Sequence, residues 1–299
     1  MSVIPKVMLA ADASAVDLTT LQYPLRVSPK LDGVRCLVWE GVAYSRNAKP
    51  IRNKFVQGWA RGYHNIDGEL IVGSATDPNC LGNTQRGVMS TGGEPDFKFH
   101  LFDCVEGGGG QAFFERLEFV LAMLGGEDRV VTVPHPIVTG PQGVQYYEDL
   151  WLAEGYEGVM LRAPHGPYKQ GRSTLREGYL MKLKRFLDGE GVVIGLEAAE
   201  KNTNEAHRDE LGRLKRSSAK AGKVALGMVG TIIIKDKKWG TMRLAPGVMS
   251  HLERQVWWEA HTASGTQVLL GKTVHWRAFG YGVKDLPRFP RFYGIRSDV

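Results

Sequence analysis

The chain has 299 residues, of which 43% are hydrophobic and 23% are charged, and its formal net charge is +6. This composition is typical of a soluble globular protein, and the positive charge favours a polyanionic partner. No run of about 18 apolar residues occurs, which excludes a membrane-spanning helix. The three cysteines are widely spaced and form neither a disulfide framework nor a zinc pattern, so we expect a cytoplasmic protein.

Strands and helices alternate irregularly in the first part of the chain, which predicts an α+β fold rather than a repeated βαβ pattern. Apolar residues at helical spacing predict one helix over 113–124 and another over 144–154. Short runs with alternating apolar residues predict strands at 35–40, 66–72, 97–104, 158–162 and 179–183.

The pattern of predicted strands and helices changes after Phe186. A strand is predicted at 192–198, a hairpin from 231–235 and 241–245, a helix over 252–260 and a last strand over 273–281. Short strands with one helix suit a small Greek-key barrel of the OB type. We therefore expect domains at residues 1–186 and 187–299, with the polar stretch 185–190 as a hinge.

Lys30 lies in the string SPKLDGVR, residues 28–35. A lysine is a nucleophile only in its uncharged form, which burial or neighbouring cations favour. Here Pro29 stiffens the approach, and the turn at Asp32-Gly33 lets the backbone come close to a ligand. Taken alone, the string fits a surface lysine beside an ordinary turn equally well.

Further strings supply the other groups that nucleotidyl transfer needs. Glu69 in DGEL can meet a ribose hydroxyl or a metal-bound water, and Glu157 in EGVMLR offers a second carboxylate for a divalent ion. Phe102 can stack on a purine, although a strand phenylalanine usually packs in the core. Lys182 and Lys184 share one strand face and suit a phosphate, unless that face is merely solvated.

In combination these strings resemble the motifs of the covalent nucleotidyltransferases, and among them those of the ATP-dependent DNA ligases. The strings occur in the family's order: KLDGVR at 30–35, YSRN at 44–47, DGEL at 67–70, FHLFD at 99–103, EGVMLR at 157–162, MKLK at 181–184, and RFPRF at 288–292 followed by RSD at 296–298. The resemblance covers the chain from about Pro24 onwards.

The resemblance implies a minimal, two-domain form similar to phage and bacterial enzymes. Its nucleotidyltransferase (adenylation) domain, with antiparallel sheets and flanking helices, would be residues 1–186, and its OB-fold barrel residues 187–299. Because only 29 residues precede Lys30, the N-terminal DNA-binding domain of large cellular ligases is expected to be missing. The protein would act as a monomer in the cytoplasm of a bacterium, or of an infected host if a phage encodes it.

The resemblance also implies the reaction and its residues. Lys30 would take AMP from ATP, pass it to the 5′-phosphate of a nick in duplex DNA, and allow the 3′-hydroxyl to seal the strand. Mg²⁺, or alternatively Mn²⁺, would be held by Glu69 and Glu157. The implied ATP- or AMP-binding residues are Pro29, Leu31, Arg35, Arg46, Glu69, Phe102, Met160, Lys182, Lys184, Arg291 and Arg296.

A basic segment at 201–227 is a candidate device for holding DNA. We expect a mobile loop between two barrel strands, whose cations contact phosphates without reading sequence. The alternative is a loop that is only solvated. The candidate DNA-binding residues are Arg46, Lys201, Arg208, Arg213, Lys215, Arg216, Lys220 and Lys223.

Other functions share parts of this pattern. An RNA ligase or an mRNA-capping guanylyltransferase would use the same lysine chemistry, and RNA discrimination depends on 2′-hydroxyl contacts that a sequence does not show. A non-enzymatic alternative is an inactive OB-type nucleic-acid-binding protein. The RFPRF string and the OB domain that ends the chain favour a DNA ligase over these alternatives.

Overall fold

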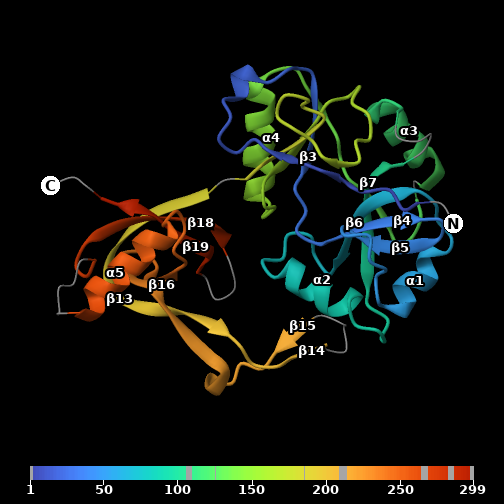
Figure 1. Ribbon diagram of the computed structural model, residues 1–299. Helices are drawn as coiled ribbons and strands as arrows, with labels where there is room; N and C mark the ends of the chain where they lie inside the picture. Colours follow the sequence, from blue (N-terminus) through green and yellow to red (C-terminus); the bar gives the residue numbers. More distant parts are fainter. Residues whose placement is uncertain are drawn as a thin grey trace. The chain divides into compact units, whose positions relative to one another are not determined.

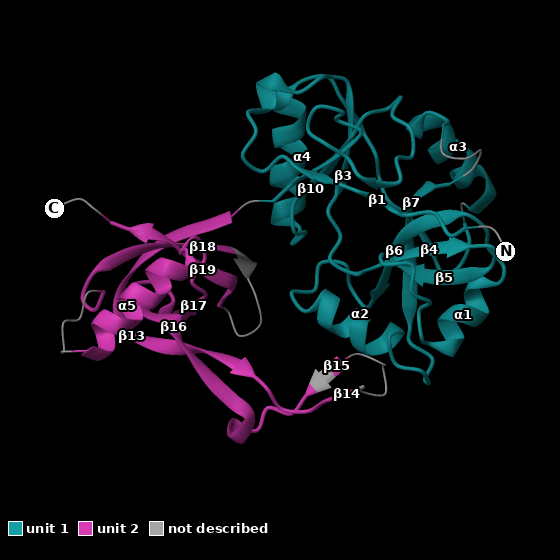
Figure 2. Cartoon of the chain, viewed as in Figure 1, with its two compact units in different colours: residues 1–185 teal, residues 186–299 magenta. Residues whose placement is uncertain are grey.

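The chain forms two compact units, residues 1–185 and residues 186–299 (Figure 2). The structure is a computed structural model that describes residues 3–105, 110–124, 126–184, 186–208, 214–263, 269–281 and 286–296. Within these ranges no helix is both long and apolar enough to cross a membrane. The mixture of sheets and helices confirms the predicted α+β class.

One sheet of the first unit brings together the strings around Lys30, Glu157 and Lys184. Its strand order is β2-β12-β10-β3-β9. In this sheet Met160 pairs with Ser28 on one side and with Lys182 on the other. The strands are β2 (Ala11–Asp12), β3 (Leu25–Pro29), β9 (Ile137–Val138), β10 (Val159–Arg162) and β12 (Leu180–Leu183).

A second sheet of this unit, with strand order β5-β4-β6-β7-β8, carries the other strings. Glu69 pairs with Arg35 on one side and with His100 on the other, so DGEL lies between KLDGVR and FHLFD. The strands are β4 (Val34–Trp39), β5 (Val42–Ser45), β6 (Ile66–Val72), β7 (Phe97–Cys104) and β8 (Val130–Thr132).

Helices cover these sheets because each turns an apolar face toward them (Figure 1). The predicted helices are confirmed as α3 (Phe113–Leu124), which packs on β7, and α4 (Pro141–Ala153), which packs on β3 and β10. Elements that the sequence did not suggest are α1 (Lys54–Ala60), α2 (Cys80–Val88), η1 (Leu18–Thr20) and the parallel pair β1 (Met8–Leu9) and β11 (Gly171–Arg172).

The second unit is a nearly closed barrel with strand order β17-β16-β13-β18-β19, as predicted for an OB-type fold. The edge strands approach each other where Ala245 N donates to Pro290 O and Phe292 N donates to Ala245 O, both at 2.9 Å. Inside, the buried indole of Trp276 donates to Asp236 Oδ2 at 2.9 Å. The elements are β13 (Phe186–Asn202), β16 (Lys223–Asp236), β17 (Gly240–Leu244), α5 (His251–Ala263), β18 (Thr273–Tyr281) and β19 (Pro287–Ile295).

The structure corrects the sequence analysis in this unit. Strand β18 is not the last, because β19 follows it and carries the RFPRF string. Residues 186–190, expected in a hinge, are paired with β18 as part of β13. The basic segment is not simply a loop: β13 and β16 stay paired as far as Asn202 and Lys223. Beyond them lie β14 (Ala206–Arg208), which pairs with β15 (Leu214–Arg216), and η3 (Lys220–Gly222).

The cysteines Cys36, Cys80 and Cys104 are all buried, and none of them forms a disulfide.

Two glycines of the first unit respond oppositely to an added methyl group. A Cβ on Gly68 would lie 2.5 Å from Phe99 Cζ and 2.6 Å from His100 O, so β6 lies against β7 only because residue 68 lacks a side chain. Gly68→Ala should lower the free energy of unfolding by about 1–3 kcal/mol because it overpacks this contact. Gly58→Ala, in helix α1 with open space around it, should raise that free energy by about 0.5–1 kcal/mol.

Urea unfolding followed by circular dichroism measures both changes. If Gly68→Ala proved as stable as the unmodified protein, the close approach of β6 and β7 would be wrong.

Candidate active site

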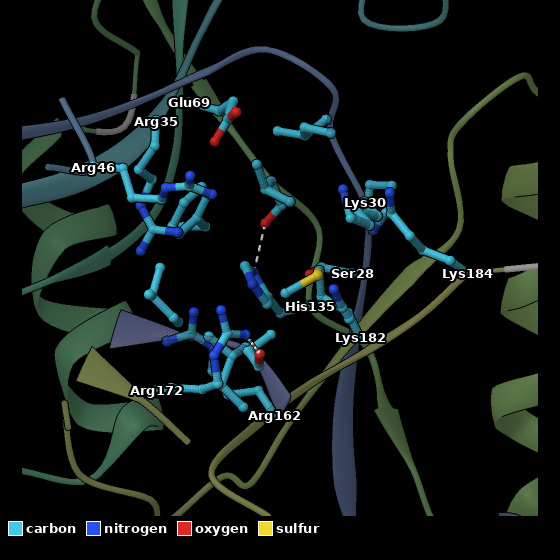
Figure 3. A pocket seen from close by; sticks show the side chains of 18 residues that line it. Ser28, Lys30, Arg35, Arg46, Glu69, His135, Arg162, Arg172, Lys182 and Lys184 are labelled. Carbon is cyan, nitrogen blue, oxygen red and sulfur yellow. Dashed lines mark hydrogen bonds between the residues drawn. The ribbon is translucent and has the colours of Figure 1, made fainter. Parts of the chain in front are cut away.

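A pocket of about 320 Å³ opens between the two sheets of the first unit. Figure 3 shows Lys30, Lys182 and Lys184 on one side of this pocket, with Arg35 and Arg46 on the other. The structure thus brings together every predicted nucleotide-binding residue of this unit. The lining residues are Leu9, Ala10, Ser28, Pro29, Lys30, Leu31, Arg35, Arg46, Glu69, Phe102, Val133, His135, Met160, Arg162, Arg172, Leu180, Lys182 and Lys184.

Glu157 forms ion pairs with two lysines, Lys30 and Lys184. One carboxylate oxygen accepts a hydrogen bond from Lys30 Nζ and the other accepts one from Lys184 Nζ. Burial acts to raise the pKa of Glu157, but both lysines act against it and keep this pKa below its ordinary value. Burial and the charge of Lys30 lower the pKa of Lys184, and Glu157 opposes them. The three side chains form a partly buried cluster, each less than one-fifth exposed.

The backbone holds this cluster in place. Lys30 follows strand β3, and its N–H donates to Gly158 O at 2.8 Å. Gly158 has φ +149°, and a Cβ there would lie 2.2 Å from Leu183 O. Only glycine allows β10 to begin so close to the end of β12, which places Glu157 beside Lys184.

Arg35 and Phe102 form the opposite wall. Arg35 binds Asp67 through Nε at 2.7 Å and through Nη2 at 2.6 Å, and Tyr168 donates to the same carboxylate at 2.6 Å. The guanidinium of Arg35 also lies 4.5 Å from the centre of the Phe102 ring. The two nitrogens of Arg35 that face Asp67 are therefore already engaged, and the face of the guanidinium lies against the Phe102 ring.

Glu69 is half-buried on β6 and lines the pocket. Burial raises its pKa to about 7, although Arg35 and Lys30 act to lower this pKa. A divalent ion would favour the ionised form. Glu69 and Glu157 are the two carboxylates predicted to hold Mg²⁺, an ion that completes its shell with water and substrate phosphates. Glu69 lines the pocket, whereas both oxygens of Glu157 accept from lysines. Among the described residues no group of three or more His, Cys, Asp or Glu side chains could hold a metal by itself.

A buried ionic network below the pocket was not anticipated. Asp103 accepts from Arg116 Nε at 2.9 Å and also binds Arg162, and all three side chains are buried. Asp103 and Arg162 stand inside strings that the sequence analysis quoted, but nothing in the sequence pairs Asp103 with Arg116.

Other pocket residues were also missed. They are Ser28, His135, Arg162 and Arg172 among polar side chains, and Leu9 and Ala10 from the N-terminal segment. Residues 1–23 had no assigned role, and strand β1 within them places Leu9 at the pocket.

Some predicted residues belong to the second unit. Arg291 is exposed on β19, and Arg296 follows this strand and donates to Glu190 at 2.7 Å. Six of the candidate DNA-binding residues lie in the described part of the basic segment. They are Lys201 on β13, Arg208 on β14, Lys215 and Arg216 on β15, Lys220 on η3 and Lys223 on β16. Arg213 lies outside the described residues, as do positions 297 and 298 of the RSD string.

The chain is similar to a known protein family and to several solved structures. The model of the ATP-dependent DNA ligase domain matches residues 7–184, more than half of the sequence. The solved Chlorella virus DNA ligase-adenylate is similar at 26% identity and a TM-score of 0.55, covering 99% of this chain and 100% of that one. A Lig E DNA ligase shares the fold, with 22% identity, a TM-score of 0.67 and coverage of 98% and 100%. No curated protein matches the chain significantly.

The Asp103 network should contribute strongly to stability. Asp103→Ala leaves the buried guanidinium groups of Arg116 and Arg162 without their counter-ion, and should lower the free energy of unfolding by about 3–5 kcal/mol. The matched control is Asp96→Ala, whose side chain is 93% exposed in its contact with Arg129, and which should leave stability nearly unchanged. Urea unfolding measures both, and equal stability of the two variants would contradict the network's role.

Proposed function

The chain belongs to the ATP-dependent DNA ligases, and from this premise we propose that it seals nicks in duplex DNA through a covalent lysyl-AMP intermediate on Lys30. The observation that carries the proposal is the cluster in which Glu157 holds Lys30 and Lys184 beside the pocket. On this proposal residues 1–186 carry out nucleotidyl transfer, and residues 187–299 form the OB-fold domain.

In the first step Lys30 Nζ, after losing a proton to solvent, attacks the α-phosphorus of ATP. A phosphorus–nitrogen bond forms, the bond to pyrophosphate breaks, and the second amine proton leaves to solvent. Because the pKa of Glu157 is below its ordinary value, this carboxylate orients Nζ rather than acting as a base. Lys182 and Lys184 face the same space and stabilise the charge that grows on the α-phosphate.

Mg²⁺ or Mn²⁺, held by Glu69 and Glu157, would supply further neutralisation of phosphate charge. Phe102 and Met160 offer apolar contacts to the adenine. Arg46, which lines the pocket, supplies a guanidinium for phosphate oxygens, and Arg35 does so to the extent that Asp67 leaves it free. Arg291 and Arg296 of the second unit would orient the pyrophosphate.

In the later steps AMP passes from Lys30 to the 5′-phosphate of the nick. The phosphorus–nitrogen bond breaks and a pyrophosphate bond to the DNA forms. The 3′-hydroxyl then attacks that 5′-phosphate, forms the phosphodiester and releases AMP. ATP and nicked DNA are the substrates, and the protein would act as a monomer in the cytoplasm.

The basic segment beyond Asn202 and Lys223 would hold the duplex. Its paired strands make an arm that carries cations away from the barrel core, and phosphate contacts by such an arm would not depend on sequence. Its residues Arg216 and Lys220 are exposed.

Lys30 is tested by label transfer. Lys30→Ala should abolish incorporation of label from α-labelled ATP into the protein, and Lys30→Arg should fail as well because a guanidinium stays protonated. Removing the divalent ion with a chelator should abolish the labelling of the unmodified protein as well. Gel electrophoresis of the labelled protein measures the transfer. Labelling of Lys30→Ala at the rate of the unmodified protein would contradict the assignment of Lys30 as the nucleophile.

The arm is tested by shortening it. Replacing residues 203–222 by Asn-Gly joins the paired positions Asn202 and Lys223 through a two-residue hairpin turn. The variant should bind nicked DNA more weakly, with a smaller dependence on salt, because phosphate contacts are lost. Its labelling by ATP should not change.

The truncation removes five basic and three acidic side chains, a net loss of two positive charges. Lys237→Ala combined with Lys238→Ala loses the same charge from the exposed turn between β16 and β17, and should keep most of the nick affinity. Equal weakening in both variants would mean that overall charge, not the arm, holds the DNA.

A further inference from the structure

His135 lies where the chain crosses from one sheet of the first unit to the other. At the start of this crossing, Val133 N donates to Leu101 O on β7 at 3.1 Å. At its end, Val27 N on β3 donates to Pro136 O at 2.9 Å. The backbone on both sides of His135 is therefore fixed by strand-like hydrogen bonds, so its side chain has a defined position.

This crossing connects the sheet that carries Phe102 to the sheet that carries Met160. Phe102 follows the β7 residue that anchors the crossing, and Met160 pairs with Ser28 on β3. All four side chains line the same pocket, and Figure 3 shows His135 beside Ser28. A flat ring bound between Phe102 and Met160 would therefore share the pocket with His135.

The hydrogen bonding of the imidazole fixes which nitrogen carries the proton. Nδ1 lies 2.8 Å from Val133 O, and a carbonyl oxygen only accepts, so Nδ1 is the donor. The ring is buried, with 8% of the residue exposed, and its edge packs on Phe113 with 5.3 Å between ring centres.

Burial and the positive charge of Arg162 lower the pKa of His135 to about 3; Arg26 acts in the same direction and Asp103 against it. The ring is therefore neutral at physiological pH, and with the proton on Nδ1 its Nε2 has a free lone pair. Among the described residues, the imidazole forms its hydrogen bond through Nδ1. The pocket thus contains a neutral imidazole whose ring is held through Nδ1 and whose Nε2 is able to accept a hydrogen bond.

We propose that His135 Nε2 accepts a hydrogen bond from the 6-amino group of adenine and so selects ATP against GTP. The proposal deepens the proposed function, on which it rests. The α-phosphate must lie at the side of Lys30, which leaves the base the space between Phe102 and Met160. Adenine has an amino donor at position 6, whereas guanine has a carbonyl acceptor there. Guanine would set two acceptors against each other and leave both without a partner.

The unmodified protein gives the first test. Purine riboside triphosphate differs from ATP only in having hydrogen in place of the 6-amino group. Its kcat/KM for labelling of the protein should be roughly tenfold lower than that of ATP, the value of one well-placed hydrogen bond. Equal kcat/KM for the two nucleotides would overturn the proposal without any variant.

His135→Leu identifies the acceptor. In this variant ATP and purine riboside triphosphate should be used almost equally, because the partner of the amino group is gone. The control is His100→Leu: His100 is also partly buried, with its pKa lowered by burial to about 4, but it does not line the pocket. This control should keep the roughly tenfold preference of the unmodified protein. A preference that survives in His135→Leu would assign the recognition to another group.

A polar replacement covers the case in which leucine prevents folding. In His135→Gln the side-chain amide can offer either a donor or an acceptor, so the ratio of kcat/KM for ATP over GTP should fall by roughly tenfold. An unchanged ratio in folded His135→Gln would contradict the proposal.

Equilibrium binding separates this inference from the covalent chemistry. Calorimetry on Lys30→Ala, which cannot form lysyl-AMP, should still give roughly tenfold weaker binding of purine riboside triphosphate than of ATP. Failure of Lys30 labelling with this binding preference intact would reject the proposed nucleophile and keep the role of His135. Labelling at Lys30 of the unmodified protein, without any preference for ATP in binding, would keep the proposed nucleophile and reject the role of His135.

Discussion

One carboxylate, that of Glu157, holds two ammonium groups together at the edge of the nucleotide pocket. Without it, Lys30 and Lys184 would repel each other in a partly buried space where charge repulsion is poorly screened. The geometry depends on Gly158, which lets β10 start against the end of β12. On the proposed function, a negative group is thus already present where the phosphates of the substrate would arrive.

Charge compensation of the same kind stiffens the rest of the pocket. Asp67 fixes the guanidinium of Arg35 against the Phe102 ring, and buried Asp103 ties together arginines from α3 and β10. Because these buried charges have counter-ions and several hydrogen bonds, they stiffen the walls of the pocket. A preformed site of this kind needs little rearrangement to receive a nucleotide.

The sequence predicted those features that a local pattern encodes. Alternating apolar residues revealed the strands with the nucleotidyl-transfer strings, and register then brought these strings together at one pocket. Strand β19 was missed because Pro287 and Pro290 interrupt the pattern, yet Pro290 needs only its carbonyl, which accepts from Ala245 at an edge of the barrel. His135 was missed because its place depends on a crossing between two sheets, which no local pattern reports. The pairing of Asp103 with Arg116 is equally non-local.

The burial of the thiols has a practical consequence. Burial raises the pKa of Cys80 to about 11 and raises that of Cys36 as well, and Cys104 is only 1% exposed. At neutral pH Cys36 and Cys80 are almost entirely in the unreactive thiol form, and burial shields Cys104 from reagents. A maleimide dye would therefore attach selectively to a cysteine introduced on the surface, for example by Ser218→Cys in the basic arm. The native background would then allow single-molecule fluorescence to follow this arm in real time.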